Sequence, residues 1–278
     1  MVNEAGKYTI ECGFIYLNSL LRGSILYAAE AMFNATEEDY RKIEQIEEGQ
    51  MRLLFATSSS CPIHLMYLES GHIPARFQIK RMMVNYFQYI LHQNVESLLF
   101  KMLMAQIVKP VKGDYYHQMT SIMGEIGISK TVHEIKNMTK SAFKTFVKQQ
   151  SREAAFAYLK QKQANGSKGT EIKYSSLQMA DYLLPQANLS IEEQREIFSI
   201  RCRTNDMKAN IGILEYCECK EVLNNSHIFK CKNLNTGEKI YDINYIMNGY
   251  TKEIKEHLKV WRENMKIRSH TLDPVILL

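Results

Sequence analysis

Signals that open and close α-helices recur along this chain, and they constrain its fold more than any other feature. Thr36 is followed three residues later by Asp39, and Ser190 is followed by Glu193 at the same spacing. In such pairs each side chain accepts a hydrogen bond from the other residue's backbone amide, which satisfies the open end of a helix. The two pairs predict helices that begin near 36 and near 190.

Apolar residues at helical spacing extend these helices and mark others. Pro62, Gly71 and Pro74 add boundaries, because proline suits a first helical turn and glycine the residue just past a last one. The expected helices, in chain order, are these: one from 36 to the serines at 58–60, one that begins after 62, one over 74–93, one over 95–108, one that ends at 125, one that begins at 129, one over 139–163, one over 190–201 and one that begins at 251. Strand signals are confined to 172–174 and to a hairpin-like turn at 235–237. The predicted fold class is mainly α.

Size and composition allow a real hydrophobic core. The chain has 278 residues, of which 45% are hydrophobic, enough for one large or two ordinary domains. The segment from Asn165 to Thr170 has the small, polar composition of a linker. We expect a helical bundle body over 1–164, a linker over 165–174 and a C-terminal helical unit over 175–278.

Charge and cysteine usage indicate an intracellular protein, in the nucleus or the cytoplasm. The formal net charge of +5 is mildly basic, so it permits a nucleic-acid partner without requiring one. The six cysteines do not form the dense, even pattern of a secreted disulfide framework. The first residues lack a secretory signal, and no run of about 18 apolar residues marks a membrane span. No membrane partner is expected.

Three thiols and one imidazole fall within a short, loop-like stretch near the C-terminal end. They are Cys217, Cys219, His227 and Cys231, the ligand set of a closed tetrahedral zinc site. A segment this short cannot bury enough apolar surface to fold alone, so metal binding would supply its folding free energy. We expect one structural Zn²⁺ in a CCHC-type knuckle over 217–231, a unit that commonly holds single-stranded nucleic acid.

The spacing of these ligands argues in both directions. His227 and Cys231 are four residues apart, which places them on one face of a helical turn. Only one residue separates Cys217 from Cys219, where two are usual, and Cys202 could replace one of these thiols. The alternative interpretation is a chance cluster in an irregular surface segment.

Basic side chains precede the cluster. Arg201, Arg203 and Lys208 could contact phosphate, since Arg and Lys make most such contacts, or could form structural salt bridges. The helix expected over 74–93 carries three further cations that could follow a nucleic-acid backbone or keep that face solvated, Arg76, Lys80 and Arg81. The basic residues of the terminal helix alternate with glutamates at pairing distance, which favours a solvated face.

No catalytic constellation can be assembled from the sequence. Histidines such as His64 and His72 have no carboxylate or thiol at motif spacing, and Glu69 and Glu125 stand isolated. Neither a glycine-rich phosphate loop nor a nucleophile elbow occurs. We therefore expect no enzymatic activity from the chain alone.

Five sequence blocks follow one another over nearly the whole chain. They are SILYAAE at 24–30, YLESGHIPAR at 67–76, KGD at 112–114, IFSIRCR at 197–203 with Lys208 and Asn210 beyond it, and the cluster that ends in HIFKC at 231. Their order and spacing resemble the C-terminal region of non-LTR (LINE-type) retrotransposon reverse transcriptases.

The resemblance implies a helical thumb, a helical connector and a zinc knuckle that helps to hold template RNA or target DNA. Its ligand positions fall on Cys217, Cys219, His227 and Cys231. Polymerisation needs clustered palm aspartates that hold two metal ions, and no adjacent Asp-Asp pair occurs in this sequence. The resemblance therefore implies a non-catalytic remnant that binds RNA or single-stranded DNA.

Two other interpretations stay open. In the first, the chain is an all-helical interaction module, and a partner protein covers the apolar helical surface without metal or nucleic acid. In the second, the chain belongs to an active polymerase whose palm comes from another chain.

Overall fold

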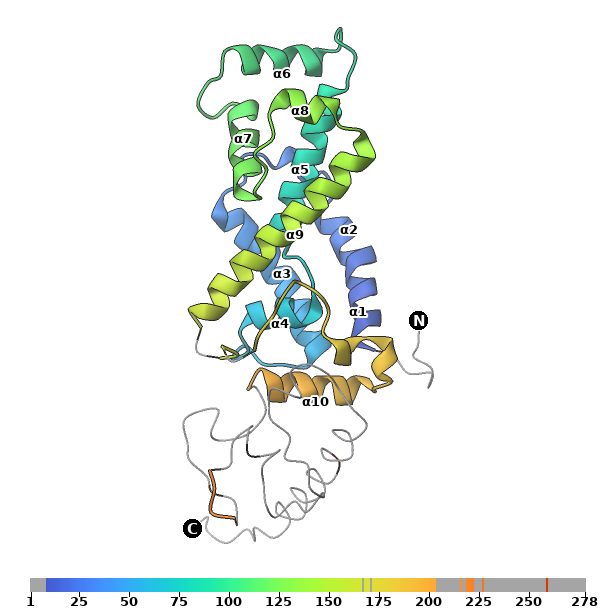
Figure 1. Cartoon of the computed structure of the whole chain (residues 1–278). Helices are drawn as coiled ribbons and strands as arrows, with labels where there is room; N and C mark the ends of the chain where they lie inside the picture. The colour runs from blue at the N-terminus through green and yellow to red at the C-terminus, as the bar shows by residue number, and fades with distance from the viewer. Residues whose placement is uncertain are drawn as a thin grey trace.

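A computed structural model describes residues 9–166, 168–170 and 172–203, together with Tyr216, residues 219–222, His227 and Lys259. Over these residues the chain is mainly helical, as predicted (Figure 1). The strand expected at 172–174 is wrong, because these residues are irregular. The hairpin expected at 235–237 lies outside the described residues, and so does the helix expected from 251, apart from Lys259.

The α-helices of the described residues are 4 to 25 residues long. In chain order they are α1 (Ile10–Tyr16), α2 (Arg22–Ile25), α3 (Glu37–Phe55), α4 (Ile63–Ser70), α5 (Ala75–Leu91), α6 (Leu98–Val108), α7 (Tyr115–Glu125), α8 (Val132–Asn137), α9 (Lys140–Ala164) and α10 (Ile191–Arg201). Short helical turns of other types lie at Leu17–Leu21, Ala29–Ala31, Asp181–Leu183 and Pro185–Ala187.

The predicted helix starts are formed by the expected side chains. Thr36 accepts a hydrogen bond from the Asp39 amide at the start of α3, and the Asp39 carboxylate accepts one from the Thr36 amide. Ser190 and Glu193 make the same reciprocal pair at α10. Gly71 ends α4 with φ of 65°, a conformation that costs glycine little because it has no Cβ. Local chemistry therefore sets these boundaries.

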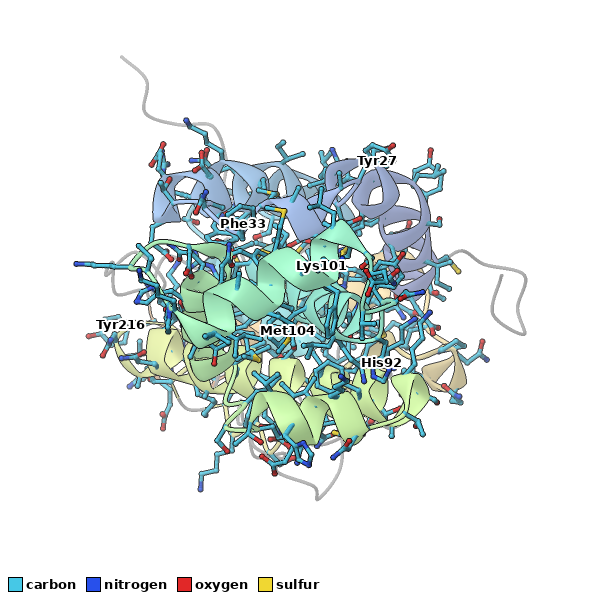
Figure 2. The ribbon with its side chains drawn as sticks, turned by 90° about the horizontal axis from the view of Figure 1, so that it is seen from above. Tyr27, Phe33, His92, Lys101, Met104 and Tyr216 are labelled. Carbon is cyan, nitrogen blue, oxygen red and sulfur yellow. The ribbon has the colours of Figure 1, made fainter. Side chains whose placement is uncertain are left out.

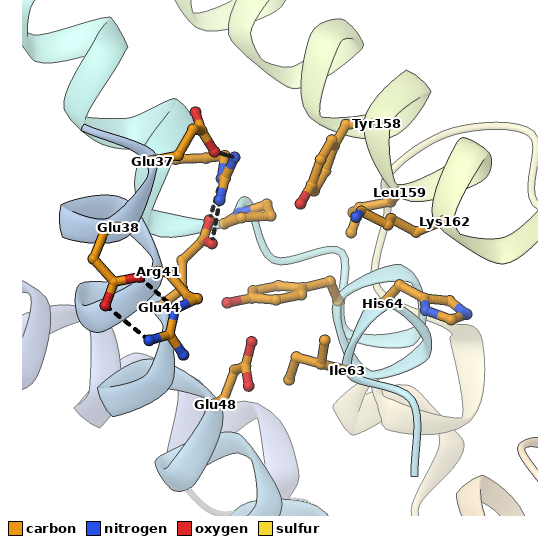
Figure 3. Close-up of a pocket in the computed structure, with 13 residues that line it drawn as sticks. Glu37, Glu38, Arg41, Glu44, Glu48, Ile63, His64, Tyr158, Leu159 and Lys162 are labelled. Atoms are coloured by element: carbon orange, nitrogen blue, oxygen red, sulfur yellow. Dashed lines mark hydrogen bonds and ion pairs between the residues drawn. The ribbon is translucent and has the colours of Figure 1, made fainter. Parts of the chain in front are cut away.

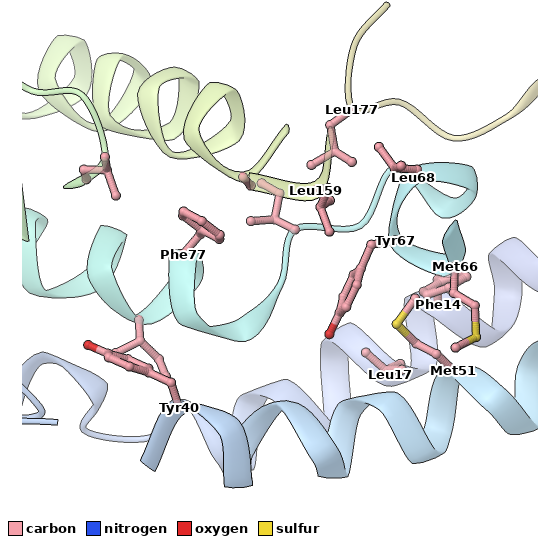
Figure 4. Close-up of a cluster of buried hydrophobic side chains, with 14 of the residues drawn as sticks. Phe14, Leu17, Tyr40, Met51, Met66, Tyr67, Leu68, Phe77, Leu159 and Leu177 are labelled. Carbon is pink, nitrogen blue, oxygen red and sulfur yellow. The ribbon is translucent and has the colours of Figure 1, made fainter. Parts of the chain in front are cut away.

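The core surrounds α5, which runs through the middle of the body and packs against α3, α7 and α9 (Figure 1). Phe77, Met83 and Phe87 of α5 are buried, and full burial of each phenylalanine contributes about 2–3 kcal/mol. In the lower half of the body, Phe14 from α1 and Met51 from α3 lie in one apolar cluster (Figure 4). This burial holds helices from distant parts of the sequence together.

The chain after α9 folds back on the body. Gln163 donates to the carbonyls of Gly169 and Ile172, and the Ala180 amide donates to the Glu69 carbonyl at 2.7 Å. Side chains of residues 177–202 belong to the same hydrophobic core as α3 to α5. The described residues of 165–174, a stretch predicted as a linker, thus lie against the body, and described residues on both sides of it, up to 202, contribute to one core. The separate unit over 175–278 stays a prediction for the residues beyond 203.

The lengths and compositions of the helices also bear on membranes. Among the described residues, no helix combines the length and the apolar character that crossing a bilayer requires.

Candidate nucleic-acid interface

The segment with the predicted metal ligands makes a tight turn where it is described. An isolated antiparallel bridge joins Tyr216 to Val222, and Lys220 between them has φ of 68°. A left-handed residue of this kind reverses the chain within a short stretch. Cys219 lies in the turn, and His227 is buried with 4% of its surface exposed.

Two of the four predicted ligands are in contact. The Cys219 Sγ atom lies 3.4 Å from the His227 Nε2 atom. A thiolate at about 2.3 Å and an imidazole nitrogen at about 2.0 Å from one tetrahedral zinc ion lie about 3.5 Å apart, so this pair fits a shared ion. A thiol-imidazole hydrogen bond has a similar separation.

The remaining two ligands, Cys217 and Cys231, lie outside the described residues. Within the part of the chain that the structure describes, no group of three or more metal-ligating side chains occurs. The predicted zinc site therefore rests on one observed pair and on two positions known from the sequence alone.

Arg201 belongs to the core and not to a surface. It is 3% exposed, and its guanidinium donates to both carboxylate oxygens of Glu69 at distances of 2.9 to 3.1 Å. Burial opposes its charge, but Glu69 raises the pKa of Arg201 above its ordinary value. Arg201 was expected either to contact phosphate or to form a structural salt bridge. In the structure it forms the salt bridge, and its burial keeps phosphate away from the guanidinium.

Glu69, which stands isolated in the sequence, is the centre of this cluster. It is fully buried and also accepts a hydrogen bond from the Tyr174 hydroxyl. Burial, together with the negative charge of Glu69, raises the pKa of Tyr174 well above its ordinary value, so the phenol stays a donor. The expectation that Glu69 is isolated is wrong, because its partners come from segments more than 100 residues away.

The other two predicted phosphate contacts lie beyond α10. Arg203, two residues past the end of the helix, is exposed and has a left-handed backbone conformation with φ of 53°. Lys208 lies outside the described residues.

Cys202, considered as a substitute zinc ligand, is buried at the end of α10 beside Cys61. The neighbouring Cys202 thiol lowers the pKa of Cys61, whereas burial raises the pKa of Cys202 well above its ordinary value. A thiol whose pKa is raised by burial is a poor metal ligand, since zinc binds the thiolate. The burial of Cys202 therefore argues against it as a substitute ligand.

A second buried carboxylate, Glu47 of α3, joins the elements at the bottom of the body. It accepts from the Nε atom of Arg22 at 2.6 Å, from the Tyr67 hydroxyl at 2.7 Å and from the Ala75 amide at 3.1 Å. Its Oε1 atom also lies 3.4 Å from Nε2 of His72. Burial raises the pKa of Glu47, but His72, Arg22 and Tyr67 outweigh it and lower the pKa to about 2. His72 thus has a carboxylate neighbour that no sequence motif shows.

Two of the cations expected on the outer face of α5 are paired instead. Arg76 donates to both oxygens of Glu44 at 2.7 and 2.8 Å and to Glu37 at 2.8 Å. Lys80 is buried and pairs with Glu125 of α7. Both expectations for these two residues, a nucleic-acid track and a solvated face, are therefore wrong.

A cleft of about 500 Å³ opens between α3, α4 and α9 beside Arg76 (Figure 3). Tyr158 projects from α9 toward it, with the Arg76 guanidinium 5.2 Å from its ring centroid. Charged groups of both signs line the cleft, namely Glu37, Glu38, Glu44, Glu48, Arg41, Arg76 and Lys162.

The arginines that line this cleft are paired with glutamates of the same cleft. Arg41 pairs with Glu38, as Arg76 does with Glu44. Burial raises the pKa of the half-buried Glu48, and burial lowers the pKa of His64. Carboxyl and imidazole groups with shifted pKa values are common in functional sites, but structural ion-pair networks also shift pKa values. With its charges largely cancelled, the cleft selects no ligand of one sign.

Helix α6 lies across the upper end of the body and exposes apolar side chains. Leu98, Leu99, Met102 and Val108 are 45–80% exposed. Figure 2, a view from above, shows this helix crossing in front of the body with Lys101 and Met104 on it. A groove of about 250 Å³ runs beside it, lined in part by Phe33. Adjacent exposed apolar residues of this kind are typical of protein contact sites.

Comparison with known proteins gives no relative. No protein-family model matches the chain, and neither the curated proteins nor the solved structures contain a significant match.

Proposed function

We propose that this protein binds RNA or single-stranded DNA without chemistry of its own, through a zinc unit formed by Cys217, Cys219, His227 and Cys231. The observation that carries the proposal is the 3.4 Å contact between the sulfur of Cys219, which lies in a tight turn, and the His227 nitrogen. Arg203 and Lys208 would supply phosphate contacts beside the unit. Arg201 would hold the end of α10 in place through Glu69.

Physical chemistry supports a metal at this turn. A sulfur and an imidazole nitrogen that meet at the ligand spacing of zinc, with two further thiols close in the sequence, make a complete tetrahedral set. The bound ion would order the turn and expose backbone and side-chain groups to an unpaired strand. The ligands must be thiolates, which a reducing compartment such as the nucleus or cytoplasm preserves.

The sequence blocks that precede the cysteine-histidine cluster support the same proposal. If the resemblance to non-LTR reverse transcriptases reflects descent, the chain is a remnant of the thumb, connector and knuckle of such an enzyme. In the structure, the block YLESGHIPAR supplies Tyr67, Glu69, His72 and Arg76 to the ion-pair networks of the body. The block therefore has a structural role that favours its retention.

The test of this proposal is zinc stoichiometry combined with binding. The purified full chain should contain one equivalent of zinc by elemental analysis, and Cys219→Ser and His227→Gln should lose it. Cys12→Ser, a thiol outside the cluster, is the matched control and should keep it. Binding to a fluorescein-labelled single-stranded RNA or DNA, measured by anisotropy, should fall on chelation and return with added zinc. A zinc-free protein that binds equally well would contradict the proposal.

The exposed apolar face of α6 favours a second candidate function, a protein-interaction module. Its test is the size of the purified chain and of Leu98→Lys/Met102→Lys, measured by light scattering with and without nucleic acid. Association that needs Leu98 and Met102, in a chain that binds neither zinc nor nucleic acid, would favour this candidate.

A further inference from the structure

Helix α9 has two chemically different faces. It is 25 residues long, which corresponds to about 37 Å at a rise of 1.5 Å per residue. Figure 1 shows it running diagonally along the body beside α5. Phe143, Val147, Ala155 and Leu159 are buried, so its apolar stripe faces inward.

The other face carries a row of lysines. Lys140, Lys144 and Lys148 are exposed and four residues apart, which separates them by about 6 Å along the helix axis. Each is followed by an exposed polar residue, in turn Ser141, Thr145 and Gln149. We call Lys140, Lys144 and Lys148 the α9 lysine row. It presents cations and hydrogen-bonding groups along a straight edge.

No acidic side chain neutralises this row in the part of the chain that the structure describes. The only acidic residue in the sequence of α9 is Glu153, and its carboxylate accepts hydrogen bonds from Gln149 and Gln150 at 2.6 and 3.1 Å. None of the three lysines lies within ion-pair distance of a described carboxylate. Three exposed charges of one sign therefore act together on this edge.

The lysine row ends at Lys148, because the next cation on this side of the helix contacts the body. Arg152, four residues beyond Lys148, donates to the carbonyls of Leu177 and Gly71 and so ties residues 172–180 to the body. Farther along, Lys160 donates to Gln163, and Lys162 lies over the Tyr158 ring. The other cations of α9 thus have intramolecular partners, in contrast to the lysine row.

We propose that the α9 lysine row binds the phosphate backbone of a nucleic-acid strand. The inference rests on the proposed nucleic-acid-binding function and adds a contact surface outside the zinc unit. Lysine is a compact charge on a flexible stem, which suits contacts to phosphates that do not depend on sequence. A polyanion is the occupant that matches a charged edge without carboxylates, whereas an apolar protein surface would leave the charges unpaired.

The size of the effect follows from counterion release. Each phosphate neutralised on a single strand contributes about 0.7 to the slope of log K against log salt. Three lysines therefore contribute about 2 to the slope, which corresponds to roughly a hundredfold in affinity at 0.1 M salt relative to 1 M.

The experiment compares two triple variants of the full chain that lose the same total charge. The test variant is Lys140→Gln/Lys144→Gln/Lys148→Gln, and glutamine keeps the helix propensity of these positions. The control is Lys42→Gln/Lys101→Gln/Lys109→Gln, which removes three exposed lysines from α3, from α6 and from the end of α6. Circular dichroism should show equal helix content in both variants.

Binding is measured by anisotropy with a labelled oligouridine RNA and an oligothymidine DNA of equal length, from 0.05 to 0.5 M salt, with zinc and after chelation. We expect the test variant to lose about 2 from the salt slope whether or not zinc is present, and the control to keep the wild-type slope. An effect with only one of the two polymers supports the row and assigns it to that backbone.

Equal slopes for wild type and test variant, or an equal loss in the control, would overturn the α9 lysine row as a binding surface. If the wild-type slope is unchanged in the test variant while chelation still weakens binding, the zinc unit survives and only this inference fails. A wild-type chain that binds neither polymer overturns both proposals.

Discussion

The charged residues of the body interior and those of the α9 lysine row lie in opposite environments. Glu47 and Glu69 are buried, and each is surrounded by donors from several segments. Lys140, Lys144 and Lys148 are exposed and have no described carboxylate partner. A buried charge that is surrounded by donors therefore stabilises the fold. An exposed charge without a described partner is available to bind another molecule.

The largest expected effect comes from breaking the buried pair. Glu69→Ala leaves the Arg201 guanidinium buried without its carboxylate, which should destabilise the fold by about 3–5 kcal/mol. The measurement is urea unfolding followed by circular dichroism. Glu96→Gln, which removes an exposed partner of Lys101, is the control and should leave the midpoint unchanged. A midpoint of Glu69→Ala equal to that of wild type would show that the cluster does not hold α10.

Low pH should destabilise the fold by protonating Glu47. Its pKa of about 2 in the fold lies below the ordinary value of 4.5, so the ionised carboxylate stabilises the fold above about pH 4.5. That contribution, about 3 kcal/mol, is lost as the pH falls toward 2. The free energy of unfolding of the wild type should therefore drop as the pH falls from about 4.5 to about 2.

The variant Glu47→Gln tests the source of this acid dependence. It should be less stable at pH 7 and should show a flatter stability curve at acid pH, because glutamine does not titrate. Urea unfolding at a series of pH values measures the curve. If the variant keeps the full slope of the wild type, other carboxylates cause the acid sensitivity.

A smaller loss is expected at the edge of the cleft. Arg76→Met removes the bidentate contact to Glu44, and hydrogen bonds to charged groups contribute about 1.5–3 kcal/mol. Thermal or urea unfolding measures the change, and Arg41→Met, an exposed arginine paired with Glu38, is the matched control. Equal stability of the two variants would show that Arg76 contributes no more to folding than an exposed arginine does.

The smallest effect on stability belongs to the lysine row. Lys144→Gln should leave the unfolding midpoint unchanged, because the side chain is exposed, yet should lower the salt slope of nucleic-acid binding by about 0.7. A marked loss of stability would mean that Lys144 has a structural partner, and the contrast between the two groups of charges would not hold.

Much of the local structure was predictable. The starts at Thr36, Thr139 and Ser190 and the end at Gly71 follow from capping chemistry that spans three or four residues. The strand at 172–174 was predicted wrongly, because Ile172 is buried under the turn after α9 through Gln163 and not paired in a ladder. Tertiary contacts override a short apolar signal of this kind.

The candidate site was predictable only in its residue types. Cys219 and His227 are close in the sequence, and their contact in the structure agrees with the predicted ligand set without testing the metal. Arg201 was expected to contact phosphate or form a salt bridge, and its sequence neighbours could not decide between these roles. Its partner Glu69 lies 132 residues away.

The sequence by itself determined where helices begin and end and where the thiols and imidazole of the predicted zinc site fall, because capping, periodicity and residue type depend on neighbouring residues. Only the tertiary structure decided which charges are paired, because ion pairs such as Glu69 with Arg201 join segments that packing alone brings together. It also decided which face of α9 carries lysines without a described carboxylate partner. Burial of Phe143 and Val147 against the body turns Lys140, Lys144 and Lys148 toward solvent.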